Sequence, residues 1–367
     1  MDSATAVRRT LGSLSIPLAL FLSACGGSSS APSTALASAP AASAQPPKPA
    51  VASSAPARAA TSEQPLAQLT IPYTAVSVSN TPIWVPIEAG LFKKYGIDAR
   101  TEFVSQSPNV TAAMLSGQTP VANQGEDSVI NADLEGGDIA IVASGMDKFL
   151  FSVFSSPKLA TVADLKGKKI GISKIGSTTD FVARLVLSKN NLQPEKDVAL
   201  IQLGGVPEIM AGIQSGAVDA GMLSPPTDAK ARQAGLKELV NLTKYDVTYY
   251  QAPLAITKSW LTGHHDQALN VLRGYAAGVA LTHRDKEQTK AIIAKYTKTD
   301  DQAVLEDAYQ ALVLALPQVP TPKADAIQTG LAQSTAPKAQ AADPNSFIDP
   351  SLVDELQKSG FIDSLYR

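Results

Sequence analysis

The stretch Leu69–Val104, LTIPYTAVSVSNTPIWVPIEAGLFKKYGIDARTEFV, contains a complete strand–helix–strand unit. Residues 69–78 alternate apolar and small polar side chains, which predicts a strand. Residues 82–95 carry apolar side chains at helical spacing, Gly96 ends this helix, and residues 97–104 return to a strand pattern. Strands that alternate with helices indicate a parallel sheet with helices on both faces, so the stretch predicts an α/β fold.

The alternation continues through the chain and repeats in its second half. The segments 112–117, AAMLSG, and 211–216, AGIQSG, close a predicted helix at the same place in each half. We therefore expect two related lobes, each a mainly parallel sheet flanked by helices; chance similarity of common strand–helix punctuation is the alternative. The further strands are predicted at residues 120–123, 139–143, 169–173, 198–203 and 218–223, and the further helices at 107–116, 127–134, 178–190 and 207–214.

Two more strand-like segments, 149–154 and 248–257, bracket the second half, and we interpret them as crossings between the lobes. Lobe I then comprises residues 66–152 plus 253–367, and lobe II comprises residues 153–252. The C-terminal part of lobe I is predicted to be helical, with its last helix packed back on that lobe. Its helices are expected at residues 267–283, 287–296, 302–314 and 351–358.

The N-terminus has the pattern of an export signal rather than of folded structure. Arg8 and Arg9 precede an apolar run, 11–22, that is too short for a membrane-spanning helix of roughly 20 residues. The following Leu22-Ser-Ala-Cys25 resembles a bacterial lipobox, so we expect a lipoprotein signal peptide at 1–24 and lipidation of Cys25; an ordinary signal peptide with a chance cysteine is the alternative. The Ala-, Ser- and Pro-rich residues 25–65 predict a disordered tether.

Composition excludes several classes of protein. The formal net charge of −2 and the sequence pI of about 6.0 argue against a nucleic-acid partner, which usually meets a basic face. The chain has one cysteine and three histidines, so it cannot form an intrachain disulfide, and a structural zinc site is not expected. We expect neither a metal nor a cofactor.

Three motifs in order resemble a known family. They are PIEAGLFKKYGID at 86–98, VADLKGKKIGI at 162–172 and GAVDA at 216–220. Together they are similar to motifs of the solute-binding proteins for nitrate, sulfonates, taurine and thiamine-pyrimidine precursors. The resemblance implies a two-lobed type II periplasmic-binding-protein fold with two hinge crossings, an extracytoplasmic location, and delivery of a small ligand to an ABC permease in the membrane. The expected protein is a monomer.

The ligand is expected at the loops that follow the strands, because open α/β sheets bind ligands outside the carboxyl ends of their strands. The loop Lys174–Asp180 is the strongest candidate, since a Gly-Ser-Thr-Thr run entering a helix offers hydroxyls and free N–H groups to an anion. Helix capping and core packing are the structural alternatives for these side chains. The candidate ligand-binding residues are Asn80, Thr81, Trp84, Gln124, Glu126, Asp127, Gly176, Ser177, Thr178, Thr179, Ser224 and Thr227.

The ligand's identity is not readable from these loops. Their lack of arginine argues mildly against nitrate, and the acids Glu126 and Asp127 suit an amine or amino-pyrimidine better than a bare anion. We therefore expect a sulfonate, a taurine-like compound or an amino-pyrimidine.

An enzyme is not expected, although an enzyme on the same scaffold stays an alternative. The resembling thiamine-pyrimidine synthase uses a Cys-rich motif that the body of this chain lacks, and no Gly-x-Ser-x-Gly elbow occurs. A binding lipoprotein that feeds a membrane sensor is the other alternative to an ABC importer component.

Overall fold

The structure is a computed structural model that describes residues 66–245, 247–334 and 336–367. The predicted signal peptide (1–24), the tether (25–65) and Cys25 lie outside the described residues. Within the described ranges, no helix combines the length and the apolarity that a bilayer crossing requires.

The first sheet takes four strands from the first half of the described chain and one from much later. Its order is β2-β1-β3-β10-β4; β1 runs parallel to β2 and β3, and β10 lies antiparallel between β3 and β4. We call this sheet and its helices lobe I. The strands are β1 (Ala67–Tyr73), β2 (Ile97–Phe103), β3 (Val121–Asn123), β4 (Ile139–Ala143) and β10 (Leu254–Thr257).

The second sheet repeats this arrangement, with the order β7-β6-β8-β5-β9. Here β6 runs parallel to β7 and β8, while β5 lies antiparallel between β8 and β9. Each sheet therefore has the same strand order and one antiparallel strand in the fourth place, which confirms the predicted two-lobed α/β class. Lobe II contains β5 (Ser152–Ser155), β6 (Lys169–Ile172), β7 (Ala199–Gln202), β8 (Ala220–Leu223) and β9 (Lys237–Asn241).

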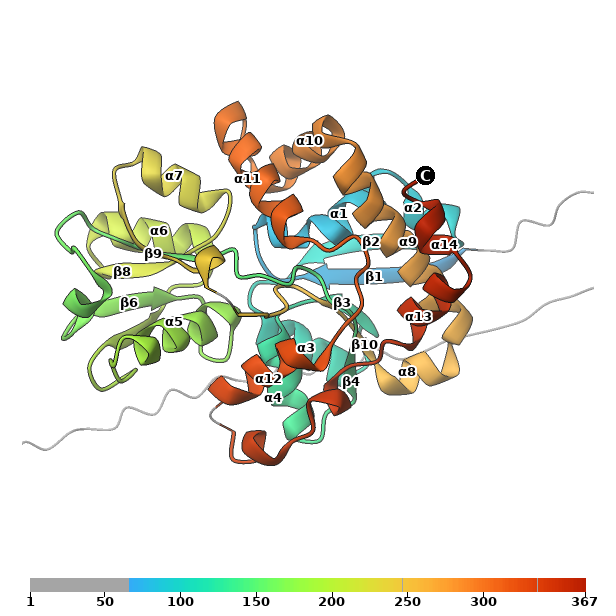
Figure 1. Ribbon diagram of the computed structural model, residues 1–367, viewed down its shortest axis with the longest axis horizontal. Coiled ribbons are helices and arrows are strands. Elements are labelled where there is room, and N and C mark those ends of the chain that lie inside the picture. The colour runs from blue at the N-terminus through green and yellow to red at the C-terminus, as the bar shows by residue number, and fades with distance from the viewer. Residues whose placement is uncertain (1–65, 246, 335) are drawn as a thin grey trace, which may run out of the picture. The chain divides into compact units, whose positions relative to one another are not determined.

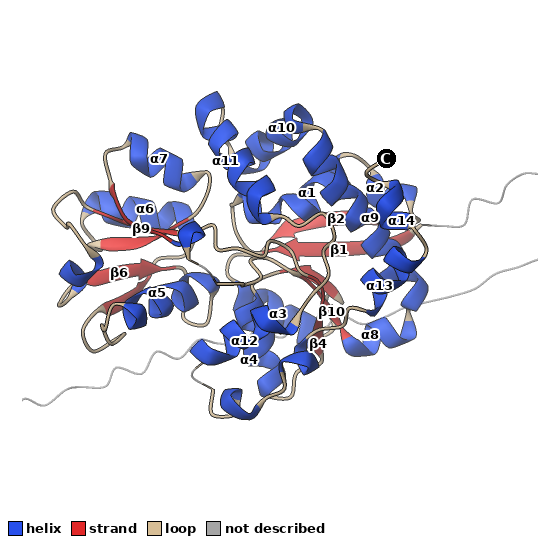
Figure 2. Cartoon of the chain, viewed as in Figure 1, coloured by secondary structure: helices blue, strands red, loops and turns tan. Residues whose placement is uncertain are grey.

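Helices cover both faces of the sheets, as Figure 1 and Figure 2 show for lobe II, where α5 and α6 lie on opposite sides of β6. Lobe II has the helices α5 (Thr178–Lys189), α6 (Val206–Ser215) and α7 (Thr227–Gln233). Lobe I has α1 (Thr81–Glu88), α2 (Leu91–Lys94), α3 (Ser107–Leu115), α4 (Glu126–Leu134), α8 (Lys258–Gly263), α9 (His265–Arg284), α10 (Lys286–Thr297), α11 (Gln302–Ala315), α12 (Ala324–Gln333), α13 (Ser351–Lys358) and α14 (Phe361–Ser364).

Local geometry divides one predicted helix. The stretch 82–95 forms two helices, α1 and α2, because Gly90 between them adopts a left-handed conformation with φ of 66°. The long helix α9 packs on both of them, and Gly278 of α9 permits the approach: a Cβ there would lie 2.5 Å from Cδ of Pro86. A helix glycine thus fixes how closely α1 and α9 pack.

The two crossings between the lobes are mostly not strands of either sheet. Met146 and Gln251 pair with each other as an isolated antiparallel bridge, with N–O distances of 3.2 and 2.9 Å. Of the strands predicted at 149–154 and 248–257, only the parts within β5 (Ser152–Ser155) and β10 (Leu254–Thr257) belong to a sheet. At their contact, Gly145 (φ 63°) faces Ala252, which has the positive φ of 54°.

Candidate ligand-binding site

A cavity of about 50 Å³ lies at the carboxyl ends of strands from both lobes. We call it the interlobe cavity. Eleven of the sixteen described residues that line it carry a hydroxyl or an amide side chain, and none of them carries a charged side chain. Lobe I contributes the loops after β1, β2 and β3, lobe II contributes those after β6, β7 and β8, and the crossings supply the rest. The lining residues are Thr74, Ala75, Ser77, Ser79, Gln106, Ser107, Gly125, Phe151, Ser173, Ser177, Thr178, Thr179, Val206, Ser224, Gln251 and Ala252.

Three hydroxyls form a connected cluster on the lobe II side of the cavity. The Oγ atoms of Ser173 and Ser177 lie 2.8 Å apart, and Oγ1 of Thr179 lies 2.7 Å from the first and 3.0 Å from the second. The backbone N–H of Ser173 also donates to Thr179, at 2.7 Å. This cluster holds the loop between β6 and α5 in one shape and places its polar groups at the cavity.

Several helices begin at the interlobe cavity. Ser107 is the first residue of α3, Thr178 the first of α5 and Val206 the first of α6. The first N–H groups of a helix have no partner within it, and the helix dipole makes this end electropositive. The cavity is therefore suited to an anionic group even though its lining carries no basic side chain.

The lobes touch each other directly on two sides of the cavity. On one side, Thr178 of lobe II donates its hydroxyl to Oδ1 of Asp127 in lobe I, at 2.9 Å. On the other side, Oγ of Ser77 in lobe I lies 3.2 Å from the carbonyl oxygen of Pro225 and 3.1 Å from Oγ of Ser224. The structure is thus a closed arrangement, because bonds between the lobes enclose the cavity.

Two buried acids lie behind the cavity wall at the start of α4. Asp127 also accepts a hydrogen bond from the Tyr249 hydroxyl at 2.6 Å, and burial raises the pKa of Asp127 to about 6. Glu126 accepts from the backbone N–H of Tyr250 at 2.8 Å, and burial raises its pKa well above the usual range. Neither acid is among the lining residues, although Asp127 bonds to Thr178, which lines the cavity.

The structure brings four of the candidate residues to the cavity and places the others elsewhere. Ser177, Thr178, Thr179 and Ser224 line it. Gly176 is next to them in the same loop, where its carbonyl accepts from Ser128 of lobe I at 3.0 Å.

The other candidates in lobe I point into that lobe. The amide of Asn80 donates to the carbonyl of Ala75 at 2.8 Å, and Gln124 accepts from Thr111 at 2.7 Å. Trp84 is fully buried and stacks on Tyr296 with ring centroids 4.6 Å apart. The remaining candidates, Thr81 of lobe I and Thr227 of lobe II, are also buried outside the cavity lining.

Several lining residues were not among the candidates. Ser77 was assigned to the first strand, which was predicted to extend to residue 78, whereas β1 ends at Tyr73. Ser79 follows the predicted strand but was not chosen as a candidate. Gln251 comes from a crossing, not from a loop after a strand, and its Oε1 accepts from the backbone N–H of Leu150 at 2.9 Å. The segment between the end of β1 at Tyr73 and the start of α1 at Thr81 is long enough to reach the cavity, and its length was the one signal in the sequence for these two serines.

Among the described residues, no group of three His, Cys, Asp or Glu side chains is placed to hold a metal ion.

Comparisons with known proteins agree on one family and fold. The family model described as NMT1/THI5 like matches residues 77–289. The putative binding protein YtlA of Bacillus subtilis is 21% identical over 255 residues, which cover 67% of this chain and 76% of that protein.

Solved structures with the same fold include an alkanesulfonate-binding protein and a periplasmic nitrate-binding protein. The alkanesulfonate-binding protein SsuA of Xanthomonas axonopodis, bound to MOPS, has a TM-score of 0.62 and 21% identity, over 79% of this chain and 97% of that one. The nitrate-binding protein NrtA of Synechocystis has a TM-score of 0.65 and 11% identity, over 82% and 91% of the two chains.

Proposed function

Because the chain belongs to the NMT1/THI5-like family, we propose that it is the extracytoplasmic solute-binding component of an ABC importer. The observation that carries this proposal is the interlobe cavity, which lies at the carboxyl ends of strands from two lobes of equal topology. Such a cavity serves capture and release by movement of the lobes. The lobe boundaries that go with the proposal are 66–152 plus 253–367 for lobe I and 153–252 for lobe II.

The ligand of the proposal is a small organic compound with a compact anionic head, such as a sulfonate or a taurine-like zwitterion. The hydroxyl cluster and the N-termini of the helices that begin at the cavity favour an anionic ligand, because they offer hydrogen-bond donors. The lining has no fixed positive charge. An amino-pyrimidine, which the acids at 126 and 127 favoured in the sequence, gains less support because neither acid lines the cavity.

The lobes must separate before such a ligand enters. Pockets that bind small molecules usually measure about 300–1,000 Å³, and the interlobe cavity measures about 50 Å³. The paired crossings are the natural hinge, since they are the covalent connections between the sheets. The ligand then stabilises the closed arrangement by adding contacts to both walls.

Calorimetric titration of the purified protein with taurine, ethanesulfonate, nitrate and an aminopyrimidine tests the ligand class. The variant carrying Ser177→Ala and Thr178→Ala removes the bond from Thr178 to Asp127 between the lobes and the bond from Ser177 to the carbonyl of Lys174. Binding should weaken by about tenfold, because the closed arrangement and the shape of this loop lose these bonds. Ser215→Ala at the far end of α6 is the matched control and should bind like the parent. Unchanged affinity in the double variant would remove this loop from the site.

Attachment to a membrane and delivery to a permease complete the proposed role. Cys25 would carry the lipid anchor, residues 1–24 would be removed on export, and a permease in the membrane would receive the ligand from the monomeric protein. Cys25→Ser should move the protein from the membrane fraction to the soluble fraction, while ligand affinity stays the same. If the parent protein, with Cys25 intact, is found in the soluble fraction, the proposed lipid anchor is wrong.

A further inference from the structure

Lobe I has a second hollow at the opposite edge of its sheet from the interlobe cavity. Ala67 and Ile97 are the first residues of β1 and β2, Pro120 precedes β3, and Thr257 is the last residue of the antiparallel β10. All four line a hollow of about 560 Å³, which we call the Trp260 pocket. Since β1 has seven residues, about 20 Å of strand separates the pocket from the interlobe cavity.

The pocket combines an apolar floor with a few polar groups, which is the usual composition of a small-molecule site. Its volume also falls within the range of such sites. None of the described residues that line it carries a charged side chain. The lining residues are Ala67, Gln68, Leu69, Ile97, Met114, Gly117, Pro120, Thr257, Ser259, Trp260 and Gln267.

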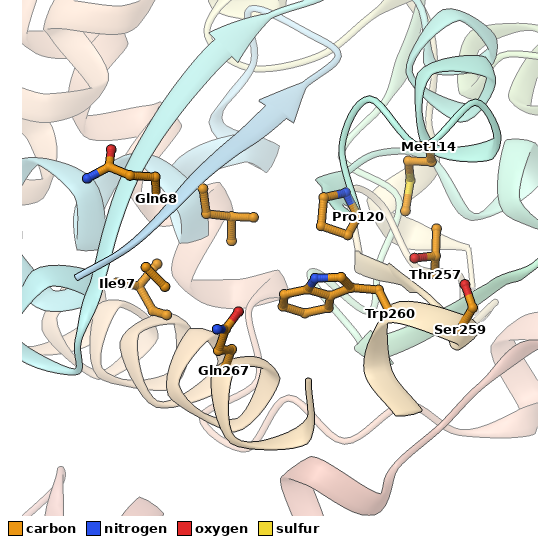
Figure 3. Close-up of a pocket in the computed structure, with 11 residues that line it drawn as sticks. Gln68, Ile97, Met114, Pro120, Thr257, Ser259, Trp260 and Gln267 are labelled. Carbon is orange, nitrogen blue, oxygen red and sulfur yellow. The ribbon is translucent and has the colours of Figure 1, made fainter. Parts of the chain in front are cut away.

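A flat aromatic surface lies in the middle of the pocket. Figure 3 shows the indole of Trp260 reaching between Pro120 and Gln267. One face of the ring stacks on His264, with centroids 5.1 Å apart and planes at 13°. This contact restricts the indole, so that stacking with a planar ligand costs less side-chain freedom.

A hydroxyl in the same pocket is free to bond a ligand. Thr257 is 8% exposed as a residue, but its Oγ1 is accessible from the pocket, and within the described residues it makes no hydrogen bond to the start of α8. It occupies the N-cap of α8, where a threonine hydroxyl would ordinarily accept from the helix, but it makes no such bond. Its oxygen lies on the side that faces the indole (Figure 3).

A hydroxyl that faces an open pocket without a protein partner is bonded by water until a ligand replaces that water. The hydroxyl of Thr257 and the amide of Gln267 could bond the edge of a ring whose face lies on Trp260. With no charge in the lining, a charged ligand would lose its hydration without compensation. The chemistry therefore selects a neutral planar compound that has a hydrogen-bonding edge.

We propose that the Trp260 pocket is a second ligand-binding site, separate from the interlobe cavity, for a neutral aromatic or heteroaromatic compound bearing an amide-like edge. Such a site would let the protein respond to a compound other than the one captured between the lobes. The proposal does not depend on the function proposed for the interlobe cavity.

Nuclear magnetic resonance of the indole N–H groups tests the proposal at the level of the residue. The chain has two tryptophans, and Trp84 is fully buried and outside the pocket. Titration of the full chain with benzamide and with nicotinamide should shift the Trp260 resonance and leave that of Trp84 in place. The expected dissociation constant is on the order of 1 mM, as suits ligands of this size. Cyclohexanecarboxamide has the same amide without a planar ring, and it should bind about tenfold more weakly.

Two variants separate binding from folding. Thr257→Val removes the hydroxyl without removing any hydrogen bond of the described protein, so the fold should persist while the affinity for benzamide falls several-fold. Trp260→Leu should weaken the binding of nicotinamide by about tenfold or more. Calorimetric titration measures this change, because the variant lacks the indole signal. Thr329→Val on α12 is the matched control and should bind both amides like the parent.

The variant with Ser177→Ala and Thr178→Ala should also leave the Trp260 response unchanged, which keeps this test independent of the interlobe cavity. An unmoved Trp260 resonance at about 10 mM amide, or equal binding of cyclohexanecarboxamide and benzamide, would overturn the proposal. Equal affinities of Thr257→Val and the parent would overturn the role of the hydroxyl.

Discussion

Asp127→Asn is expected to stabilise the protein at neutral pH and to remove part of its pH dependence. The carboxyl group is buried between the lobes, and burial raises its pKa from the ordinary 3.8 to about 6. A raised pKa means that the folded protein binds the proton more tightly than the unfolded chain does. The stability that this proton provides is complete below pH 4, declines as the pH rises to about 6, and is absent above.

The size of the effect follows from the pKa. A shift from 3.8 to about 6 corresponds to about 3 kcal/mol between the two protonation states. The asparagine side chain resembles the protonated acid, and both hydroxyl donors, Thr178 and Tyr249, bond to the same oxygen, Oδ1. An asparagine oxygen can accept both, so the substitution removes the buried charge and retains these bonds.

Urea denaturation at several pH values between 4 and 8 measures this prediction. Asp127→Asn should match the parent near pH 4 and exceed it by up to about 3 kcal/mol near pH 7.5. Glu135→Gln, an exposed acid just after the same helix, is the matched control and should change the free energy of unfolding by about 0.5 kcal/mol at most. Other buried acids contribute slopes of their own, so the difference between variant and parent is the quantity to compare. A constant difference across this pH range would refute the reasoning.

Two glycine substitutions test the packing of lobe I and the contact between the crossings. Gly278→Ala should destabilise the protein by about 1–3 kcal/mol, since its Cβ would lie 2.5 Å from the ring of Pro86; Gly263→Ala, with no atom within 4 Å, should leave the thermal midpoint unchanged or slightly raised. Gly145→Ala places a Cβ 2.5 Å from the carbonyl oxygen of Ala252 and forces a left-handed alanine, so we expect a loss of about 2 kcal/mol or more by urea denaturation. A Gly145→Ala protein as stable as the parent would show that the crossings separate at little cost.

The sequence by itself predicted the local elements and their order. Apolar spacing indicated the strand–helix alternation from residue 69 onward, and the similar segments 112–117 and 211–216 end α3 and α6, which hold equivalent places in the two lobes. These features depend on residues close together in the chain, so spacing alone reveals them. The loop 174–180 was likewise identified from its own residues, and part of it lines the interlobe cavity.

The direction of individual side chains was decided by tertiary structure. Asn80 and Gln124 follow strands, as the candidate residues should, but each bonds within lobe I and does not reach the cavity. Ser77 and Gln251 line the cavity although one was assigned to a strand and the other to a crossing. A loop's position after a strand predicts the edge of the sheet where it lies, whereas the backbone dihedrals and the opposing lobe decide which atoms face the ligand.

Long-range pairing also decided the fourth strand of each sheet. Nothing near β10 or β5 in the sequence marks either strand as antiparallel or names its neighbours, since β10 pairs with strands more than a hundred residues earlier. The residues of the chain thus determined the elements and the family, because those signals are local. The closed cavity, the buried Asp127 and the Trp260 pocket exist only in the folded protein, because each is built from segments that are distant in the sequence.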